Sequence, residues 1–275
     1  MATVLFWNTD GKSLEREITQ VCHTHGVDIL IVAESPLEAV SFLPVLNANQ
    51  RQIYTEPPNP STRLKFFTRL PNDAVEIVLD EGGIAARNIR LPIGDPFLLI
   101  GVHLSSKMAY KDVDLALLST RVNQLVGIAE GKVGHDRTVL VGDFNMDPFE
   151  SGIVGSEGLH AVMDKRIARS AARTVLGRKC RFFYNPMWAI MGNPSLGPLG
   201  TLYYPSSTPV SYFWHTFDQV MVRPSLLDVF PENQIRIMTS INGTTLLRPN
   251  GRPHRRFSDH LPLLFKLEIE KQTQV

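Results

Sequence analysis

Cysteine is scarce in this 275-residue sequence: Cys22 and Cys180 are the only two, and neither lies in a C-x-x-C or other zinc-ligand pattern. A disulfide-stapled secreted scaffold and a structural zinc site are therefore not expected. Long apolar runs are also lacking, since residues 27–33 and 97–102 fall far below the roughly 18 residues that a membrane-spanning helix needs. No secretion signal is visible at the N-terminus, so we expect a cytoplasmic protein without membrane insertion.

An excess of charge of either sign is missing as well. The 28 Lys and Arg against 27 Asp and Glu give a formal net charge of +1 and a pI of about 7.8. This balance excludes an acidic disordered chain and a globally basic nucleic-acid binder. Glycine and proline number 19 each, which excludes collagen-like and low-complexity classes. The 43% of hydrophobic residues suffices for a substantial core in one large domain or two small ones.

Apolar and β-branched runs alternate with a few helical patterns. The runs predict strands over residues 3–7, 28–33, 64–69, 74–79, 97–104, 138–142, 217–222 and 263–269. Helical spacing of apolar residues predicts helices over 14–22 and 113–130, and a third from the N-cap Asp164 to the stop signal Gly177. Because the helices are too few for strict alternation with strands, we expect a mixed or largely antiparallel sheet in a layered domain.

Two stretches stand out by composition. Residues 182–217 hold ten aromatic residues and five prolines, which predicts a long packed loop region, serving either recognition or a lobe of the core. Residues 165–181 contain seven Lys and Arg and no acid, and Arg166, Arg169 and Arg173 are spaced to share one helix face. A second basic cluster lies in residues 248–256. Each cluster suits a polyanionic partner or a solvated surface.

Polar side chains interrupt the predicted strands at their ends. A carboxylate beside a hydrophobic strand costs several kcal/mol if it is buried unpaired. We therefore expect these groups to converge on a solvent cleft, on one another or on a cation. Carboxylate and amide oxygens without a thiolate cluster favour Mg²⁺ or Mn²⁺. The residues in question are Asn8, Asp10, Glu34, His103, Asp143, Asn145, Asp218, Asp259 and His260.

The order of these motifs resembles the endonuclease/exonuclease/phosphatase superfamily, with its deoxyribonuclease I-like fold. The most specific blocks are Gly-Asp-Phe-Asn at 142–145 and Ser-Asp-His at 258–260. Residues 7–11 look like the apurinic/apyrimidinic endonuclease branch, whereas His103 looks like the deoxyribonuclease I and sphingomyelinase-type branches. The resemblance implies an α/β (α+β) four-layer sandwich of two facing mixed sheets flanked by helices. It covers residues 1–275 as a single domain, with a specificity region at about 165–216.

The resemblance also implies a role for each motif residue. Glu34 would be the central metal ligand, supported directly or through water by Asn8, Asp10 and Asp259. Asp143 and Asn145, two apart on an extended segment, would hold the attacking water. His260, oriented by Asp218, would act as general base or as an imidazolium against the phosphate, and His103 would donate to a phosphate oxygen. Which of Asp143 and His260 takes the proton stays open.

We expect a metal-dependent phosphoesterase, and a nucleic-acid or nucleotide phosphodiester as its substrate. Basic clusters and aromatic loops suit phosphates and unpaired bases. A phosphomonoesterase or a lipid- or inositol-headgroup phosphodiesterase is the alternative, and a non-catalytic binding module on this fold is a third. The sequence does not predict the oligomeric state. The candidate substrate-binding residues are Arg69, Arg181, Tyr184, Trp188, Tyr204 and Trp214.

Overall fold

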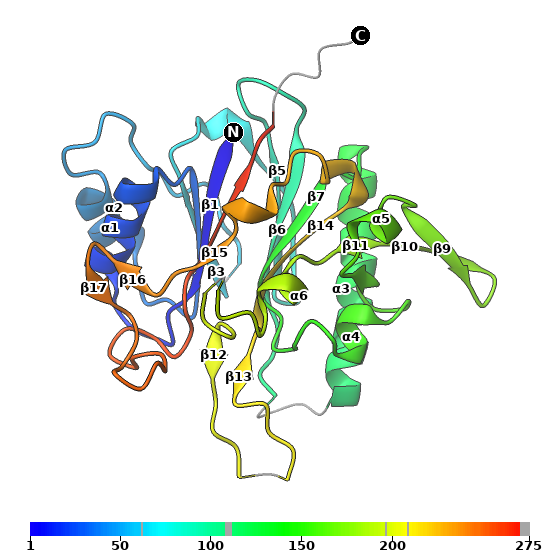
Figure 1. Cartoon of the computed structure of the whole chain (residues 1–275). Helices are drawn as coiled ribbons and strands as arrows, with labels where there is room; N and C mark the ends of the chain where they lie inside the picture. Colours follow the sequence, from blue (N-terminus) through cyan, green and yellow to red (C-terminus); the bar gives the residue numbers. More distant parts are fainter. Residues whose placement is uncertain (62, 108–111, 196, 208, 270–275) are drawn as a thin grey trace.

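The strand-forming runs of the sequence are gathered into two mixed β-sheets that face each other (Figure 1). The computed structural model describes residues 1–269 except 62, 108–111, 196 and 208. One sheet has the order β15-β18-β1-β2-β3, formed by Arg236–Ile237, Leu263–Leu267, Ala2–Asn8, Ile29–Ala33 and Leu64–Thr68. The other has the order β4-β5-β6-β7-β14-β11-β8, formed by Val75–Glu81, Ile84–Ile89, Phe97–His103, Thr138–Asp143, Asp218–Val222, Phe183–Tyr184 and Ala161–Val162.

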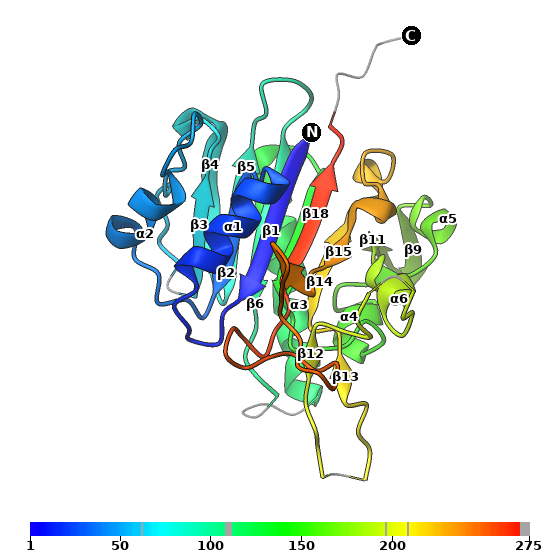
Figure 2. The same ribbon diagram turned by 60° about the vertical axis from the view of Figure 1, so that its left-hand side comes forward.

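Helices cover the outer face of each sheet. Figures 1 and 2 show α1 (Glu15–His25) and α2 (Ala39–Leu46) against the five-stranded sheet, and α3 (Asp112–Val133) and α4 (Ser151–Val154) against the seven-stranded sheet. The order of layers is therefore helix, sheet, sheet, helix, as the resemblance implies. The remaining helical turns are short: α5 (Lys165–Ala168), α6 (Met187–Ile190), and the 3₁₀ turns η1 (Asn72–Ala74), η2 (Pro224–Leu226) and η3 (Glu232–Gln234).

The alternation of side chains along β7 shows how the layers are packed. Val139 and Val141 belong to the core that includes the facing sheet, whereas Leu140 belongs to the core beneath α3. All three side chains are fully buried. A strand with apolar residues on both faces is expected where a sheet is covered on both sides.

The region around 164–181 differs from its prediction. Asp164 does cap a helix, since its carboxylate accepts from the backbone of Arg166 and Ile167, but α5 ends at Ala168. The chain then forms a hairpin of β9 (Ala172–Val175) and β10 (Arg178–Arg181). Leu176 and Gly177 both have positive φ, 47° and 78°, as a two-residue hairpin turn requires. The predicted helix is therefore confirmed only over Lys165–Ala168 and is wrong over residues 169–176.

The other predicted elements are confirmed, but helix α2 and four strands of the two large sheets, β5, β8, β11 and β15, were not predicted. Strand β5 was missed because its Ala-Ala-Arg-Asn centre lacks β-forming residues. Residues 182–217 are irregular apart from β11, α6 and the hairpin of β12 (Leu202–Tyr203) and β13 (Trp214–His215). A further small hairpin joins β16 (Ser240–Ile241) to β17 (Thr244–Thr245). Among the described helices, none combines the length and apolarity needed to cross a membrane.

Candidate active site

The predicted motifs meet at one edge of the two sheets, which we call the catalytic edge. Parallel pairing brings the end of β1 beside that of β2, and the end of β6 beside that of β7. The antiparallel strands β14 and β18 begin at the same edge. The side chains gathered there are Asn8, Glu34, His103, Asp143, Asn145, Asp218 and His260, with Asp10 and Asp259 beside them.

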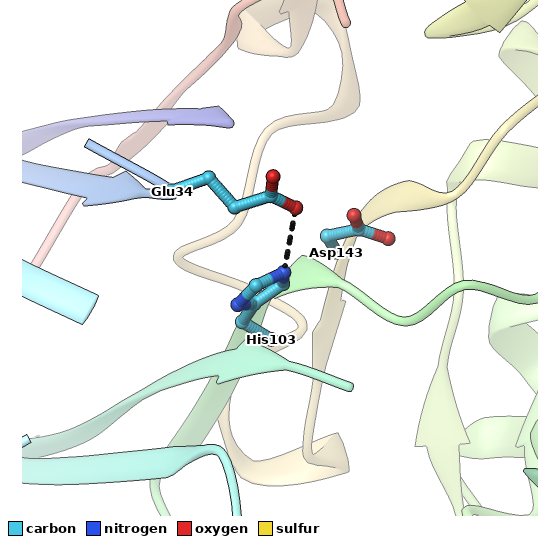
Figure 3. A group of neighbouring side chains, drawn as sticks. All are labelled: Glu34, His103 and Asp143. Atoms are coloured by element: carbon cyan, nitrogen blue, oxygen red, sulfur yellow. Dashed lines mark hydrogen bonds and ion pairs between the residues drawn. The ribbon is translucent and has the colours of Figure 1, made fainter. Parts of the chain in front are cut away.

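Glu34 lies at the centre of a hydrogen-bonded network. Its Oε1 accepts from Asn8 Nδ2 at 3.0 Å. The same oxygen lies 3.1 Å from His103 Nε2, the contact drawn in Figure 3. The same Asn8 amide donates to Asp143 Oδ2 at 3.1 Å and so joins the two carboxylates. The hydrogen bond to His103 lowers the pKa of Glu34 to about 2 against the opposing effect of burial. Glu34 is therefore an anion at neutral pH.

Three site residues have a left-handed backbone. Asp10, Glu34 and Asn145 have φ of 49°, 47° and 51°. For residues with a Cβ this conformation costs about 1–2 kcal/mol each, although Asn and Asp tolerate it best. The turns are held by hydrogen bonds from Thr9 N to Ala33 O at 3.0 Å and from Gly11 N to Glu34 O at 2.8 Å. Such strain at a cluster of polar groups is typical of a functional site.

His260 is held between carboxylates. Its Nδ1 lies 2.7 Å from Asp218 Oδ2, and its Nε2 lies 3.8 Å from Asp143 Oδ2 and 3.9 Å from Asp259 Oδ1. Trp7 Nε1 donates to the His260 carbonyl at 3.0 Å and fixes the backbone. Burial alone lowers the pKa of the imidazole, but the charges of Asp218 and Asp143 outweigh it and raise the pKa to about 10.

Asp143 is almost fully buried, and burial raises the pKa of its carboxyl group. Its Oδ1 accepts from the backbone N of Asn145 at 2.8 Å, and Asn145 Nδ2 donates to Leu104 O at 3.0 Å. The two side chains are thus fixed relative to each other by the turn that follows β7.

Gly142 precedes Asp143 at the closest approach of β6 and β7. A Cβ at this position would lie 1.8 Å from the carbonyl oxygen of Val102, and φ is 152°. Only glycine fits here. The glycine of the Gly-Asp-Phe-Asn block therefore sets the position of Asp143 relative to His103.

The donor set suits a hard divalent cation. The ligand atoms of Glu34, His103 and Asp143 all lie within 4.8 Å of one another, and so do those of Asp143, Asp218 and His260. Three of these five residues offer carboxylate oxygens, the ligands that Mg²⁺ or Mn²⁺ prefers. Two further acids lie close by: Asp10 N donates to Asn8 Oδ1 at 3.1 Å, the Asp10 carboxylate is paired with Lys12, and Asp259 flanks His260.

The structure does not bring three of the predicted substrate-binding residues to the catalytic edge. The guanidinium of Arg69 donates to the carboxylate of Asp28, the residue just before β2. Arg181 is paired with Glu130. Tyr184 is buried, pairs with Val222 at the far end of β14 from Asp218, and donates its hydroxyl to Glu232. These three residues lie outside the candidate active site.

The other three belong to the aromatic region next to the edge. Trp214 is on β13, in the hairpin that reaches the site through a bridge from Leu202 to His260. Tyr204 is 47% exposed beyond β12 on the same hairpin. Trp188, on α6, packs edge-on against Phe149, with the two ring centroids 6.3 Å apart.

Sequence reasoning missed a second Asp–His pair. Asp147 Oδ2 lies 2.7 Å from His215 Nδ1, and Asp147 Oδ1 accepts from the backbone N of Thr216 at 2.7 Å. This pair ties the β12–β13 hairpin to the turn after β7. The spacing of Asp143, Asn145 and Asp147, each two residues apart, was the available signal.

No family model and no curated protein matches the chain. Solved structures do. An AP endonuclease from Archaeoglobus fulgidus is 13% identical with a TM-score of 0.55, over 98% of this chain and 100% of that one. The 3' phosphatase NExo from Neisseria, bound to a product DNA hairpin, is 15% identical with a TM-score of 0.52 over 97% and 99%. An endonuclease/exonuclease/phosphatase family protein from Bacteroides thetaiotaomicron is 14% identical with a TM-score of 0.52 over 97% and 98%.

These likenesses extend over almost the whole of each chain, at identities that carry information on fold alone. The protein has the deoxyribonuclease I-like fold that its motifs predict.

Proposed function

We propose that this protein is a divalent-metal-dependent phosphodiesterase that cleaves nucleic acid or nucleotides by attack of water. The observation that carries the proposal is the convergence of Asn8, Glu34, Asp143 and the Asp218–His260 pair on one edge of the fold. Each of these groups has a function in phosphoester hydrolysis, and the packing of the core alone requires none of them.

Glu34 and Asp143 would hold the cation, with Asn8, Asp10 and Asp259 supporting it directly or through water. A bound Mg²⁺ or Mn²⁺ supplies positive charge to a phosphate oxygen and to the leaving oxygen. His103, whose Nε2 contacts Glu34, keeps that carboxylate ionised and oriented.

The remaining groups act on the attacking water and the phosphate. Asp143 and Asn145 orient the water, and Asp143 accepts its proton. His260, surrounded by the carboxylates of Asp218, Asp143 and Asp259, carries a positive charge and donates from Nε2 to the phosphate as negative charge develops.

A nucleic-acid substrate is supported by the basic loop next to the aromatic hairpin. The guanidinium of Arg252 lies 4.3 Å from the ring centroid of Tyr203 on β12, and Arg256 lies over Phe257. Residue 257 is next to the Ser-Asp-His block. Cations and rings together suit a phosphate backbone with unpaired bases. Among the similar structures are an AP endonuclease and a phosphatase bound to a DNA hairpin.

The test is a cleavage assay on supercoiled plasmid, single-stranded DNA and RNA with Mg²⁺ or Mn²⁺. Wild type is expected to cleave at least one of them, and the Asn145→Ala variant, purified identically, to cleave none. Chelation of the metal should stop the reaction. Equal cleavage by both proteins would identify a contaminant. No cleavage by folded, metal-binding wild type would contradict the proposal, and release of inorganic phosphate from a monoester would then favour the phosphomonoesterase alternative.

A further inference from the structure

A cavity of about 250 Å³ lies against the catalytic edge. Glu34 and His103 form the wall on the side of the active site. The other lining residues are Val32, Ser35, Arg63 and Lys65. Two of these, Arg63 and Lys65, are cations that the site described above does not use.

Within the described part of the chain, no carboxylate forms an ion pair with the guanidinium of Arg63. By contrast, Arg87 on β5 and Arg90 just after it pair with Asp80 and Glu76. Lys65 differs from Arg63, because its ammonium contacts the Leu37 carbonyl and lies 3.0 Å from Glu38 Oε1. Arg63 therefore has its donors available for an anion, and a guanidinium fork matches a phosphate.

The segment that carries Arg63 is fixed in place. Ser61 Oγ accepts from the backbone N of Arg63 at 3.3 Å and of Leu64 at 3.2 Å. Asn59 Nδ2 donates to Leu64 O at 2.6 Å, and Asn59 Oδ1 accepts from the buried Arg87 at 2.8 Å. The entry to β3 is thus anchored to a buried side chain, so the backbone at Arg63 is well defined.

The position of the guanidinium also places it beside the active site. Arg63 Nη1 lies 3.7 Å from where a Cβ on Gly83 would be. The carbonyl of Gly83 accepts from the backbone N of His103 at 2.8 Å. A second cavity of about 380 Å³ is lined by Arg63 together with Ser105, the turn at Gly82 and Gly83, and two acids, Asp80 and Glu81, which are paired with Arg87 and Arg121. Arg63 therefore lines open space on two sides, next to the end of β6.

We propose that Arg63 and the 250 Å³ cavity form a subsite for a second phosphate of the substrate, next to the scissile phosphodiester. This inference rests on the proposed function and narrows its substrate class. The preferred substrate carries at least two phosphates in a row, as in an oligonucleotide or a nucleotide with a terminal phosphate, and an isolated phosphoester is a poor substrate.

The kinetic test compares dinucleoside monophosphates with and without a terminal phosphate, placed at the 5′ or at the 3′ end. Wild type should cleave one phosphorylated form with a kcat/KM at least about tenfold higher than the unphosphorylated form, since one charge-assisted contact is worth about that much. In Arg63→Gln this ratio should fall close to one, and Arg63→Lys should keep part of it. The end that gives the advantage identifies which neighbouring phosphate occupies the subsite.

Arg90→Gln is the matched control. It removes the same charge from an exposed arginine beyond the far end of β5, away from His103. It should keep the wild-type ratio. The inference is overturned if Arg63→Gln keeps the ratio too, or if Arg90→Gln loses it to the same extent.

A binding measurement separates this inference from the proposed function. A labelled trinucleotide with a terminal phosphate is titrated into Asn145→Ala, which should not cleave it, and into Asn145→Ala/Arg63→Gln. The second substitution should weaken binding about tenfold and reduce the slope of log K against log salt by about 0.7, the value for one phosphate contact on a single strand. Unchanged affinity would overturn the subsite. Arg63-dependent binding in a protein that cleaves no phosphodiester would keep the subsite and contradict the proposed function.

Discussion

Buried charged side chains are paired differently at the two ends of the β-sandwich. At the far end, where β7 begins, Glu130 accepts from Arg223 and Thr138 at 2.8 and 2.9 Å and is also paired with Arg181. Each of these three charged side chains, Glu130, Arg223 and Arg181, has an ionic partner. At the catalytic edge, where β7 ends, the Asp143 carboxylate is buried with amide donors, a second carboxylate near by, and His260 at 3.8 Å.

The comparison teaches that clustered charge in a sequence does not by itself mark a binding surface. The basic stretch 165–181 suited either a polyanionic partner or a solvated surface, and in the structure Arg166, Arg169 and Arg178 are paired with Asp164, Asp228 and Glu157. These acids come from other segments of the chain or from just before the stretch. At the catalytic edge, by contrast, the fold brings several carboxylates together. In our proposal a divalent cation from solution neutralises their negative charge.

The largest effect is expected at the catalytic edge. His260→Gln should lower kcat/KM for a phosphodiester by about 10²- to 10³-fold, because the charged donor to the phosphate is lost. Circular dichroism should stay close to wild type, but the melting temperature should fall, because buried Asp218 loses its ionic partner; activity is therefore normalised to the folded fraction. If the variant keeps most of its activity while folded, His260 has no part in the reaction and the contrast between the two ends disappears.

Gly142→Ala should be the most damaging single-methyl change. The added Cβ would collide with the Val102 carbonyl at 1.8 Å, so β6 and β7 must separate at a cost of about 3 kcal/mol in the free energy of unfolding. Urea denaturation measures this. Gly127→Ala in α3 is the control, since nothing lies within 4 Å of its Cβ and alanine favours a helix by about 0.5–1 kcal/mol. Equal effects of the two substitutions would contradict the close approach.

Glu130→Gln tests the far end. Arg223 is buried with its guanidinium 3.8 Å from the Phe183 ring centroid, and removing its ionic partner should cost about 3 kcal/mol of stability. Activity per folded molecule should not change. A lower kcat in a fully folded Glu130→Gln sample would mean that the far end influences the active site, and would contradict the separation of the two ends.

Lowering the pH is expected to have a smaller effect on the free energy of unfolding, through His160 at the base of the β9–β10 hairpin. Burial and the charge of Arg173 lower the pKa of His160, so its protonation opposes folding. Wild type should lose free energy of unfolding, relative to His160→Asn, as pH falls below about 6.5. Asparagine is chosen because residue 160 has a φ of 51°. Parallel stability curves for the two proteins from pH 8 to 5 would refute this assignment.

Local pattern was sufficient to predict eight of the twelve strands in the two large sheets, helices α1 and α3, and the residues of the catalytic edge. Strand ends that carry polar residues are visible in sequence, and chain order matched a known fold. The hairpin at 172–181 was not predictable from helical spacing, because the deciding feature is the left-handed pair Leu176–Gly177. The roles of Arg69 and Tyr184 depended on pairing with Asp28 and Val222, which are distant in sequence.

The most direct test of the account is a side-by-side measurement of phosphodiester cleavage by wild type, His260→Gln and Glu130→Gln, normalised to the folded fraction of each protein. With Mg²⁺ or Mn²⁺, wild type and Glu130→Gln should cleave at similar rates, and the rate of His260→Gln should be lower by about 10²-fold or more. Equal rates for all three proteins, or a loss confined to Glu130→Gln, would contradict the assignment of the catalytic edge as the active site.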